Sequence, residues 1–192
     1  PQLKWSRWLN MSGTFLAFQV DQKPFDDVRV RRALNYAVNK EAIIRDILKG
    51  TAIVATTPLS PVYGPFHEDK TVRYPYDPEK AKALLKEAGF ASGFDLTFFV
   101  PESGSGMQSP VEMGTVIQAN LNAVGVRAKI QTMEWGAYLK KYLDGPDMAQ
   151  MSWNPSIGDP DHRMYMLLSS DRFPPAFNAG YYQNPRVDDL LR

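Results

Sequence analysis

Apolar residues recur along this chain with two kinds of spacing, one typical of strands and one typical of helices. Runs rich in β-formers predict strands at residues 14–20, 94–100 and 149–153, and the alternating run 126–133 predicts a fourth. Apolar residues spaced three and four apart predict six helices, of which the last three are 110–124, 135–143 and 159–168.

The starts of the first three helices carry capping signals. Asp26 or Asp27 can cap the first, which runs to Val38, and Asn39 can cap the second, which ends at Gly50. The third begins with Asp77, a proline at the first helical position and an acid in the first turn, and it ends at Gly89. Residues 55–76 between them carry four prolines and predict a long loop.

Strand and helix alternate three times from residue 94 onward, which predicts an α/β domain with a mixed, mainly parallel sheet flanked by helices. Ligands on such sheets gather at the carboxyl ends of the strands. Two loops leave such ends, at residues 101–109 and 154–158. We find no repeat and no second compositional region, so residues 1–192 are expected to form a single domain.

Composition narrows the classes of function. The 192 residues are 44% hydrophobic and 22% charged with a net charge of +1, which gives no basic field for nucleic acid. No apolar run approaches the roughly 20 residues of a membrane span. The chain has no cysteine, which excludes disulfides and thiolate chemistry. Because it starts at Pro1 and stops in what reads as a new helix at residues 187–192, we expect an excised part of a longer protein.

The sequence offers little for catalysis or metal binding. The loop PESGSGMQS has glycines and serines but lacks the Lys-Ser/Thr ending of a phosphate loop. Its amides, around Ser103, Gly104 and Ser105, either meet a ligand carboxylate or form a plain surface loop.

Neither His67 nor His162 has metal-ligand spacing. A dyad of His162 with Ser156 is conceivable, but a histidine in the first turn of a helix is expected to face solvent or the cap. Asp159 and Asp161 lie at a helix start, where acids cap the backbone. We therefore predict no catalytic residue, no metal site and no cofactor.

The aromatic residues leave two readings open. Trp153, at the end of the last strand, either belongs to the core or offers its ring to a ligand, with Asn154 beside it. Tyr181 and Tyr182 either line a cleft or cover a sheet edge.

Four segments carry a resemblance to a known family, and they occur in the same order as in that family: KPFDDVRVRRALNYAVNKEAII, YPYDPEKAKALLKEAGF, VGVRAKIQTMEWGAYLKK and WNPSIGDPD. Together they resemble the family 5 extracytoplasmic solute-binding proteins, the peptide-, nickel- and glutathione-type binding proteins of ABC importers. The resemblance covers essentially the whole chain. It implies one lobe of a periplasmic-binding-protein type II fold, with this chain as most of the second lobe.

The same resemblance implies a function and a setting. The parent protein is expected to be exported, periplasmic or extracellular and membrane-anchored. It would capture a small peptide or glutathione-like solute between two lobes and deliver it to a membrane permease, without enzymatic activity or nucleic acid binding. The expected partners are therefore the solute, the permease and the first lobe of the same chain.

Individual positions refine the ligand. In peptide binders of the family the third residue after the corner tryptophan is usually an aspartate that receives the ligand's α-amino group, and here it is Ser156. Dipeptide binders can carry an arginine in the loop that matches 101–109, and here Gly104 stands about there. Trp153 and Ser156, followed by PPAFNAGYYQNPRVDDLL, resemble the glutathione-binding branch more closely. The resemblance thus implies a ligand-binding set, which consists of Trp153, Asn154, Ser156, Ser103, Gly104, Ser105 and Tyr181.

Two other functions stay open from the sequence. The same lobe could sense a ligand within a transcriptional regulator, in which case the parent chain would begin with a DNA-binding domain rather than a signal peptide. A hydrolase built on Ser156 and His162 is the less favoured alternative.

Overall fold

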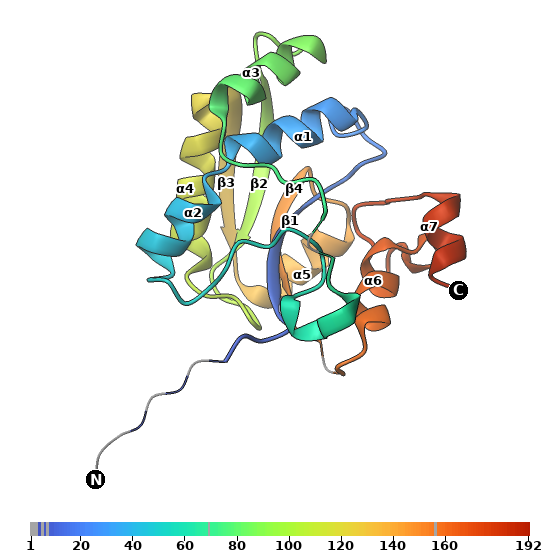
Figure 1. Ribbon diagram of the computed structural model, residues 1–192. Helices are drawn as coiled ribbons and strands as arrows, with labels where there is room; N and C mark the ends of the chain where they lie inside the picture. The colour runs from blue at the N-terminus through green and yellow to red at the C-terminus, as the bar shows by residue number, and fades with distance from the viewer. Residues whose placement is uncertain (1–3, 5, 7, 69, 156) are drawn as a thin grey trace.

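The computed structural model describes residues 4, 6, 8–68, 70–155 and 157–192, which contain one four-stranded sheet. Its strands are β1 (Gly13–Phe18), β2 (Phe94–Pro101), β3 (Val126–Met133) and β4 (Met148–Trp153), in the order β1-β4-β2-β3. Strand β2 runs parallel to β3 and β4, and β1 runs antiparallel to β4 at the edge. The predicted mixed, mainly parallel sheet is confirmed, and helices flank it (Figure 1).

The predicted helices form with small changes of boundary. They are α1 (Val28–Ala37), α2 (Lys40–Ala42), α3 (Pro78–Glu87), α4 (Pro110–Ala123), α5 (Trp135–Leu143), α6 (Pro160–Leu168) and α7 (Pro185–Leu190). The predicted helix after Asn39 is split, because α2 passes into a π-helical turn, η1 (Ile43–Ile47). Two short 3-10 helices were not predicted, η2 (Pro61–Phe66) and η3 (Ser170–Arg172).

The three predicted capping residues hold their helix starts. The side chain of Asp27 accepts a hydrogen bond from the Arg29 amide, and that of Asn39 from the Ala42 amide. Asp77 accepts from the Lys80 amide in the same way. Each cap satisfies a backbone donor that has no partner inside its helix.

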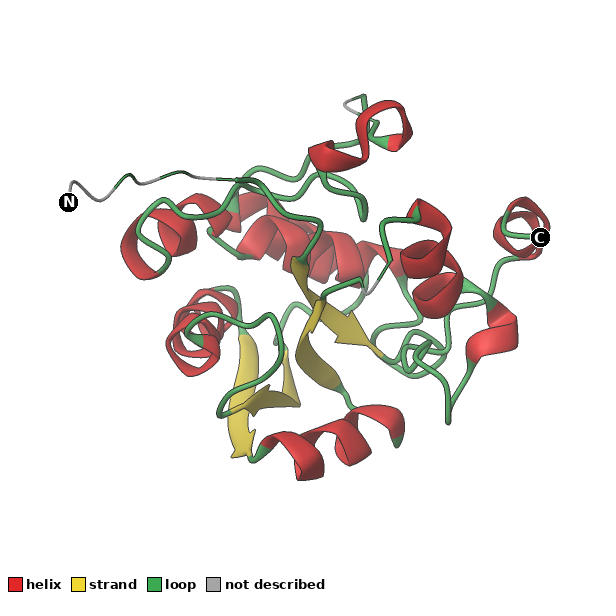
Figure 2. Ribbon diagram, turned by 90° about the horizontal axis from the view of Figure 1, so that it is seen from below, coloured by secondary structure: helices red, strands yellow, loops and turns green. Residues whose placement is uncertain are grey.

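Helices lie on both sides of the sheet (Figure 2), and each side has its own cluster of buried apolar residues. Alternate side chains of a strand point to opposite faces, so Phe98 and Val100 pack with α1, α3 and α4, whereas Phe99 packs with α5. On α4, Met113 and Gly114 are buried, whereas Val111 and Val116 are only partly buried. Glycine is required at 114 because a β-carbon there would lie 2.9 Å from Val100.

Several chain segments meet along one edge of the sheet, the edge at which its parallel strands end. Strands β2, β3 and β4 all end there, and β1 begins there, because Gly13 pairs with Trp153. The segment between η1 and η2 runs across this end (Figure 1): Thr51 Oγ1 lies 3.3 Å from Gln108 Oε1, and Ser60 Oγ donates to the Asn10 carbonyl at 2.9 Å. Within the described ranges no helix has the length and hydropathy to cross a bilayer.

We predict that Gly93→Ala destabilises the fold much more than Gly89→Ala. Both glycines have positive φ, +70° and +88°, so alanine costs each about 1–2 kcal/mol of conformational strain. At Gly93 the new β-carbon would also lie 1.8 Å from the Gly125 carbonyl oxygen, whereas nothing lies within 4 Å of it at Gly89. Urea unfolding of both variants measures their free energies of unfolding. Equal losses of stability would show that the close approach of residues 93 and 125 does not restrict the side chain at position 93.

Candidate functional site

Two loops and two strand ends are tied together at the edge where β4 ends. Ser152 Oγ donates to the Ser105 carbonyl at 2.6 Å, and Ser12 Oγ donates to Asn154 Oδ1 at 2.8 Å. A β-carbon on Gly106 would lie 3.3 Å from the Asn154 side chain. The loop after β2 therefore folds over the end of β4, as the topology predicted.

Trp153 is 9% exposed and belongs to the packed face that carries α5 and α6. Its ring lies 5.3 Å from that of Phe177 and 5.5 Å from that of His162, between ring centroids. The indole Nε1 is buried and has no hydrogen-bond partner among the described residues. Trp153 is thus a buried residue beside these loops, and its indole N–H has no acceptor among the described residues.

The other candidate residues are placed as follows. Ser103, Ser105 and Asn154 are exposed on the two loops. Gly104 lies against Trp135, since a β-carbon there would be 2.6 Å from the indole ring. Ser156 lies outside the described residues.

Tyr181 is not brought to this edge. It is half-buried, has a φ of +53°, and its ring lies 5.3 Å from that of Phe173. The preceding carbonyl, of Gly180, accepts from the Val20 amide, beyond the far end of β1. Five residues of β1 separate that end from Gly13, which corresponds to roughly 17 Å.

A cavity of about 630 Å³ opens beside this edge, between β1, the end of α1, η1 and the segment that follows η1. Its floor includes Leu16, Leu34 and Ile117. Several polar side chains also line it, among them Asn10, Ser12, Thr14, Asn35, Gln150 and Arg163. Such a volume suits a small ligand, because sites for these are typically about 300–1,000 Å³.

Gln150 projects from the middle of β4 and is fully buried. Neither its Oε1 nor its Nε2 has a hydrogen-bond partner among the described residues, although the side chain lines the cavity. The backbone beneath it is anchored, because the buried Tyr138 hydroxyl donates to the Gln150 carbonyl. Burial raises the pKa of Tyr138, so this hydroxyl remains a donor.

Buried polar atoms without partners are rare in folded proteins, and here they gather in one place. Seven such side-chain atoms occur in the described part of the chain, and six come from five residues around this edge. These residues are Tyr63, Gln150, Trp153, His162 and Arg163. Of these five residues, Gln150 and Arg163 also line the cavity, where a polar ligand could complete their hydrogen bonds.

The two histidines are placed as follows, while Ser156, the proposed partner of His162 in a hydrolase, lies outside the described residues. His162 packs on Trp153, and its buried Nδ1 has no partner among the described residues. His67 Nδ1 lies 2.7 Å from the Leu59 carbonyl oxygen, which fixes that ring within the loop. The described residues contain no group of three or more His, Asp or Glu that could hold a metal ion.

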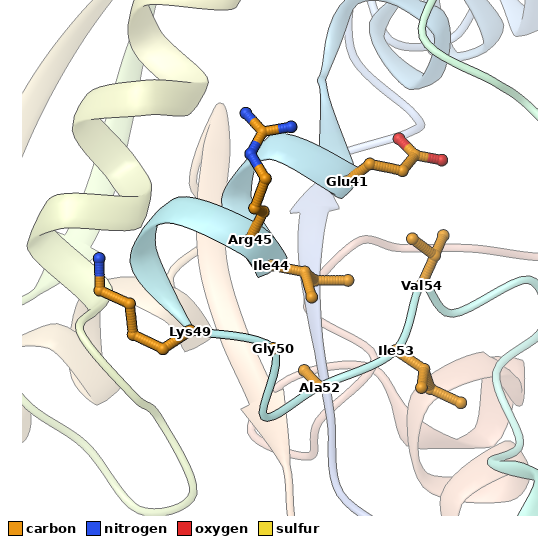
Figure 3. A pocket seen from close by; sticks show the side chains of 8 residues that line it. All are labelled: Glu41, Ile44, Arg45, Lys49, Gly50, Ala52, Ile53 and Val54. Carbon is orange, nitrogen blue, oxygen red and sulfur yellow. The ribbon is translucent and has the colours of Figure 1, made fainter.

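A second hollow lies on the outer side of α2 and η1, lined by Glu41, Ile44, Arg45, Lys49 and residues 50, 52, 53 and 54 (Figure 3). Its centre is apolar, and the charged ends of Arg45 and Lys49 point away from it. Arg45 forms a salt bridge of 2.6 Å with Asp46 instead. Without inward polar groups this hollow lacks the features of the cavity at the sheet edge.

Comparison with known proteins settles the family. The sequence model described as bacterial extracellular solute-binding proteins, family 5 Middle, matches residues 1–175. The chain belongs to this family. The dipeptide-binding protein of Escherichia coli K12 is 43% identical over 180 residues, which cover 93% of this chain and 34% of that protein.

Other family members differ in the ligand that they are named for. Heme-binding protein A of Haemophilus influenzae is 38% identical over 192 residues, covering 99% of this chain and 34% of that protein. A glutathione-binding protein of Shigella flexneri is 34% identical over 184 residues, which cover 92% of this chain and 35% of that protein. The chain thus spans about a third of the length of these family members.

A solved structure confirms the fold within the family. The ABC-transporter-associated periplasmic binding protein of Helicobacter pylori, in complex with the peptide STSA, is 34% identical and superposes with a TM-score of 0.88. The match covers 95% of this chain and 35% of that one. The α/β architecture is therefore that of the periplasmic-binding-protein type II fold.

Sequence reasoning missed two side chains of the cavity, Gln150 and Arg163. A signal existed for Gln150, because it is a long polar residue in the middle of the strand MAQMSW, whose neighbours Ala149 and Met151 are apolar. No comparable pattern marked Arg163.

We predict that Gln150→Met stabilises the protein by about 1 kcal/mol. The substitution approximately conserves the side-chain volume. It also removes an amide that is buried without hydrogen bonds, and burying such a group lowers the free energy of unfolding by roughly 1–3 kcal/mol. Equilibrium urea unfolding without ligand measures it, with Gln118→Met as the control, because Gln118 Nε2 donates to the Ala128 carbonyl at 2.9 Å and should lose stability. A loss of stability in Gln150→Met would mean that the amide already has a partner.

Proposed function

We propose that this chain is the ligand-capture lobe of a solute-binding protein of an ABC importer. Its solute would be a small peptide or a glutathione-like molecule, held between this lobe and the rest of the parent chain. The observation that carries the proposal is the cavity at the carboxyl end of the sheet, lined by polar side chains that include the buried and unpaired Gln150 and Arg163.

The lining of the cavity supports a peptide-like solute. Peptides present amide and carboxylate groups, and the cavity offers amide, hydroxyl and guanidinium partners on Ser12, Asn35, Gln150 and Arg163. A mostly apolar ligand such as a heme macrocycle would leave the amide of Gln150 unsatisfied, which disfavours it. The names of the relatives differ, so the choice rests on the chemistry of the cavity.

The assignment of this chain to the second lobe is part of the proposal. In such a protein, closing two lobes about a hinge excludes water and adds contacts from the facing lobe. The exposed Ser103, Ser105 and Asn154, with Ser156, Gly104 and Trp153, are the proposed contacts on this side. Tyr181 would contact solute only through a rearrangement, because of its place at the far end of β1.

We further propose that the parent protein is periplasmic or extracellular, anchored to the membrane, and partnered by a membrane permease. The family's extracellular description supports this setting over a cytoplasmic regulator. Transport would need no catalytic group.

Calorimetry and thermal shift on the full parent protein test the function. We expect short peptides or glutathione to bind, and a ligand at 100 times its Kd to stabilise the protein by about 2.7 kcal/mol. Sugars and Ni²⁺ serve as controls and should give no shift. A response to the controls alone, or to none of these solutes, would contradict the proposal.

The two-lobe arrangement gives a second prediction. The chain of residues 1–192 alone should bind the same solute at least about 100-fold more weakly than the parent protein, because it lacks the facing lobe's contacts. This corresponds to about 2.7 kcal/mol of missing binding free energy. Equal affinities, measured side by side by calorimetry, would show that the site is complete within this chain.

A further inference from the structure

Arg163 is the only residue of α6 that is buried, and its side chain lines the cavity. It is 6% exposed. Arginine is rarely buried without a carboxylate partner, because its charge loses the solvation of water. Its position therefore needs a physical reason.

No described residue supplies a partner for this charge. Nε is completely buried without a hydrogen bond, and no ion pair or hydrogen bond joins Nη1 or Nη2 to a described residue. Burial lowers the pKa of the guanidinium, and the nearby Tyr63 opposes that shift. Arginine nevertheless stays charged at neutral pH, so the cavity holds an uncompensated cation.

The surroundings hold the guanidinium in place. It lies over Gly13, where a β-carbon would be 2.8 Å from both Nη1 and Nη2. It also lies 5.9 Å from the centre of the Phe15 ring, within the range of a cation–π contact. A side chain fixed in this way has already lost its rotational freedom, which favours binding of an anion.

The other charged side chains that line the cavity are positive as well. Lys40 and Arg73 also line it, and the described lining residues include no aspartate or glutamate. Lys40 Nζ is engaged with the carbonyls of Asn35 and Tyr74, which leaves Arg163 as the buried cation without an acceptor. An ammonium group has no carboxylate to meet in this cavity.

We propose that Arg163 binds a carboxylate of the solute, and that the solute is therefore a peptide or glutathione-like molecule with a free carboxylate. The planar guanidinium can donate two parallel hydrogen bonds to a carboxylate. Gln150 pairs with Leu16 on β1, and strand alternation turns its side chain to the other face of the sheet from the Gly13 position that Arg163 covers, so Arg163 alone carries the assignment. This inference rests on the proposed function and specifies its ligand.

Calorimetry on the full parent protein tests the inference with two pairs of probes. One pair is the tripeptide Ala-Leu-Ala and its C-terminal amide, and the other is glutathione and its dimethyl ester. The wild type should bind the free acid of the pair that it accepts at least 10-fold more tightly than the blocked form.

Arg163→Gln should remove this preference. Its affinity for the acid should fall at least 10-fold, while its affinity for the blocked form stays within threefold. Arg163→Lys should keep part of the preference. Arg172→Gln is the matched control, because Arg172 also has a buried unpaired Nε but does not line the cavity.

The outcomes separate the two proposals. Binding of both forms with equal affinity, or an unchanged preference in Arg163→Gln, overturns the role of Arg163 while the proposed function stands. An unchanged preference together with a lower melting temperature would assign Arg163 to a structural ion pair elsewhere in the parent chain. No binding of any probe overturns the proposed function and this inference with it.

Discussion

At the end of the sheet where its parallel strands finish, the fold buries polar side chains without giving them hydrogen-bond partners, and the rest of the structure depends on this conflict. Folding buries the amide of Gln150 and the guanidinium of Arg163, yet it gives neither a partner among the described residues. Burying such groups unpaired costs stability. A fold that keeps them beside a cavity holds them ready for an external partner, as expected of a binding protein.

The fold produces this edge from simple parts. Parallel strands must end on the same side, and the antiparallel β1 begins there, so four chain segments converge. Small residues then let the segments approach: Gly13 makes room for Arg163, and Gly104 makes room for Trp135. Hydrogen bonds from Ser152 and Ser12 fix the loops to one another. The site is thus built from strand ends together with loop segments, among them residues 51–61, which line much of the cavity.

The sequence predicted the parts of this structure that obey local rules. Strand and helix periodicity, and caps such as Asp27 and Asp77, act within a few residues, so the elements and the sheet class followed from them. The predicted edge also followed, because the carboxyl ends of parallel strands define it. The ordered motifs gave the family, which the comparisons confirmed.

What the sequence did not reveal depends on distant contacts. Trp153 belongs to a packed layer only because Phe177 and His162 fold against it. The isolation of Arg163 is visible only once α6 places it over Gly13, and Tyr181 is separated from the edge by the length of β1. The helix after Asn39 passes into a π turn, for which its apolar spacing gave no signal.

The most direct measurement is a crystal structure of the intact parent protein with the solute that copurifies with it. The account predicts that solute atoms lie within hydrogen-bonding distance of the Gln150 amide, with an acidic group at the Arg163 guanidinium. A solute bound elsewhere, with both side chains paired to other residues of the parent chain, would contradict it.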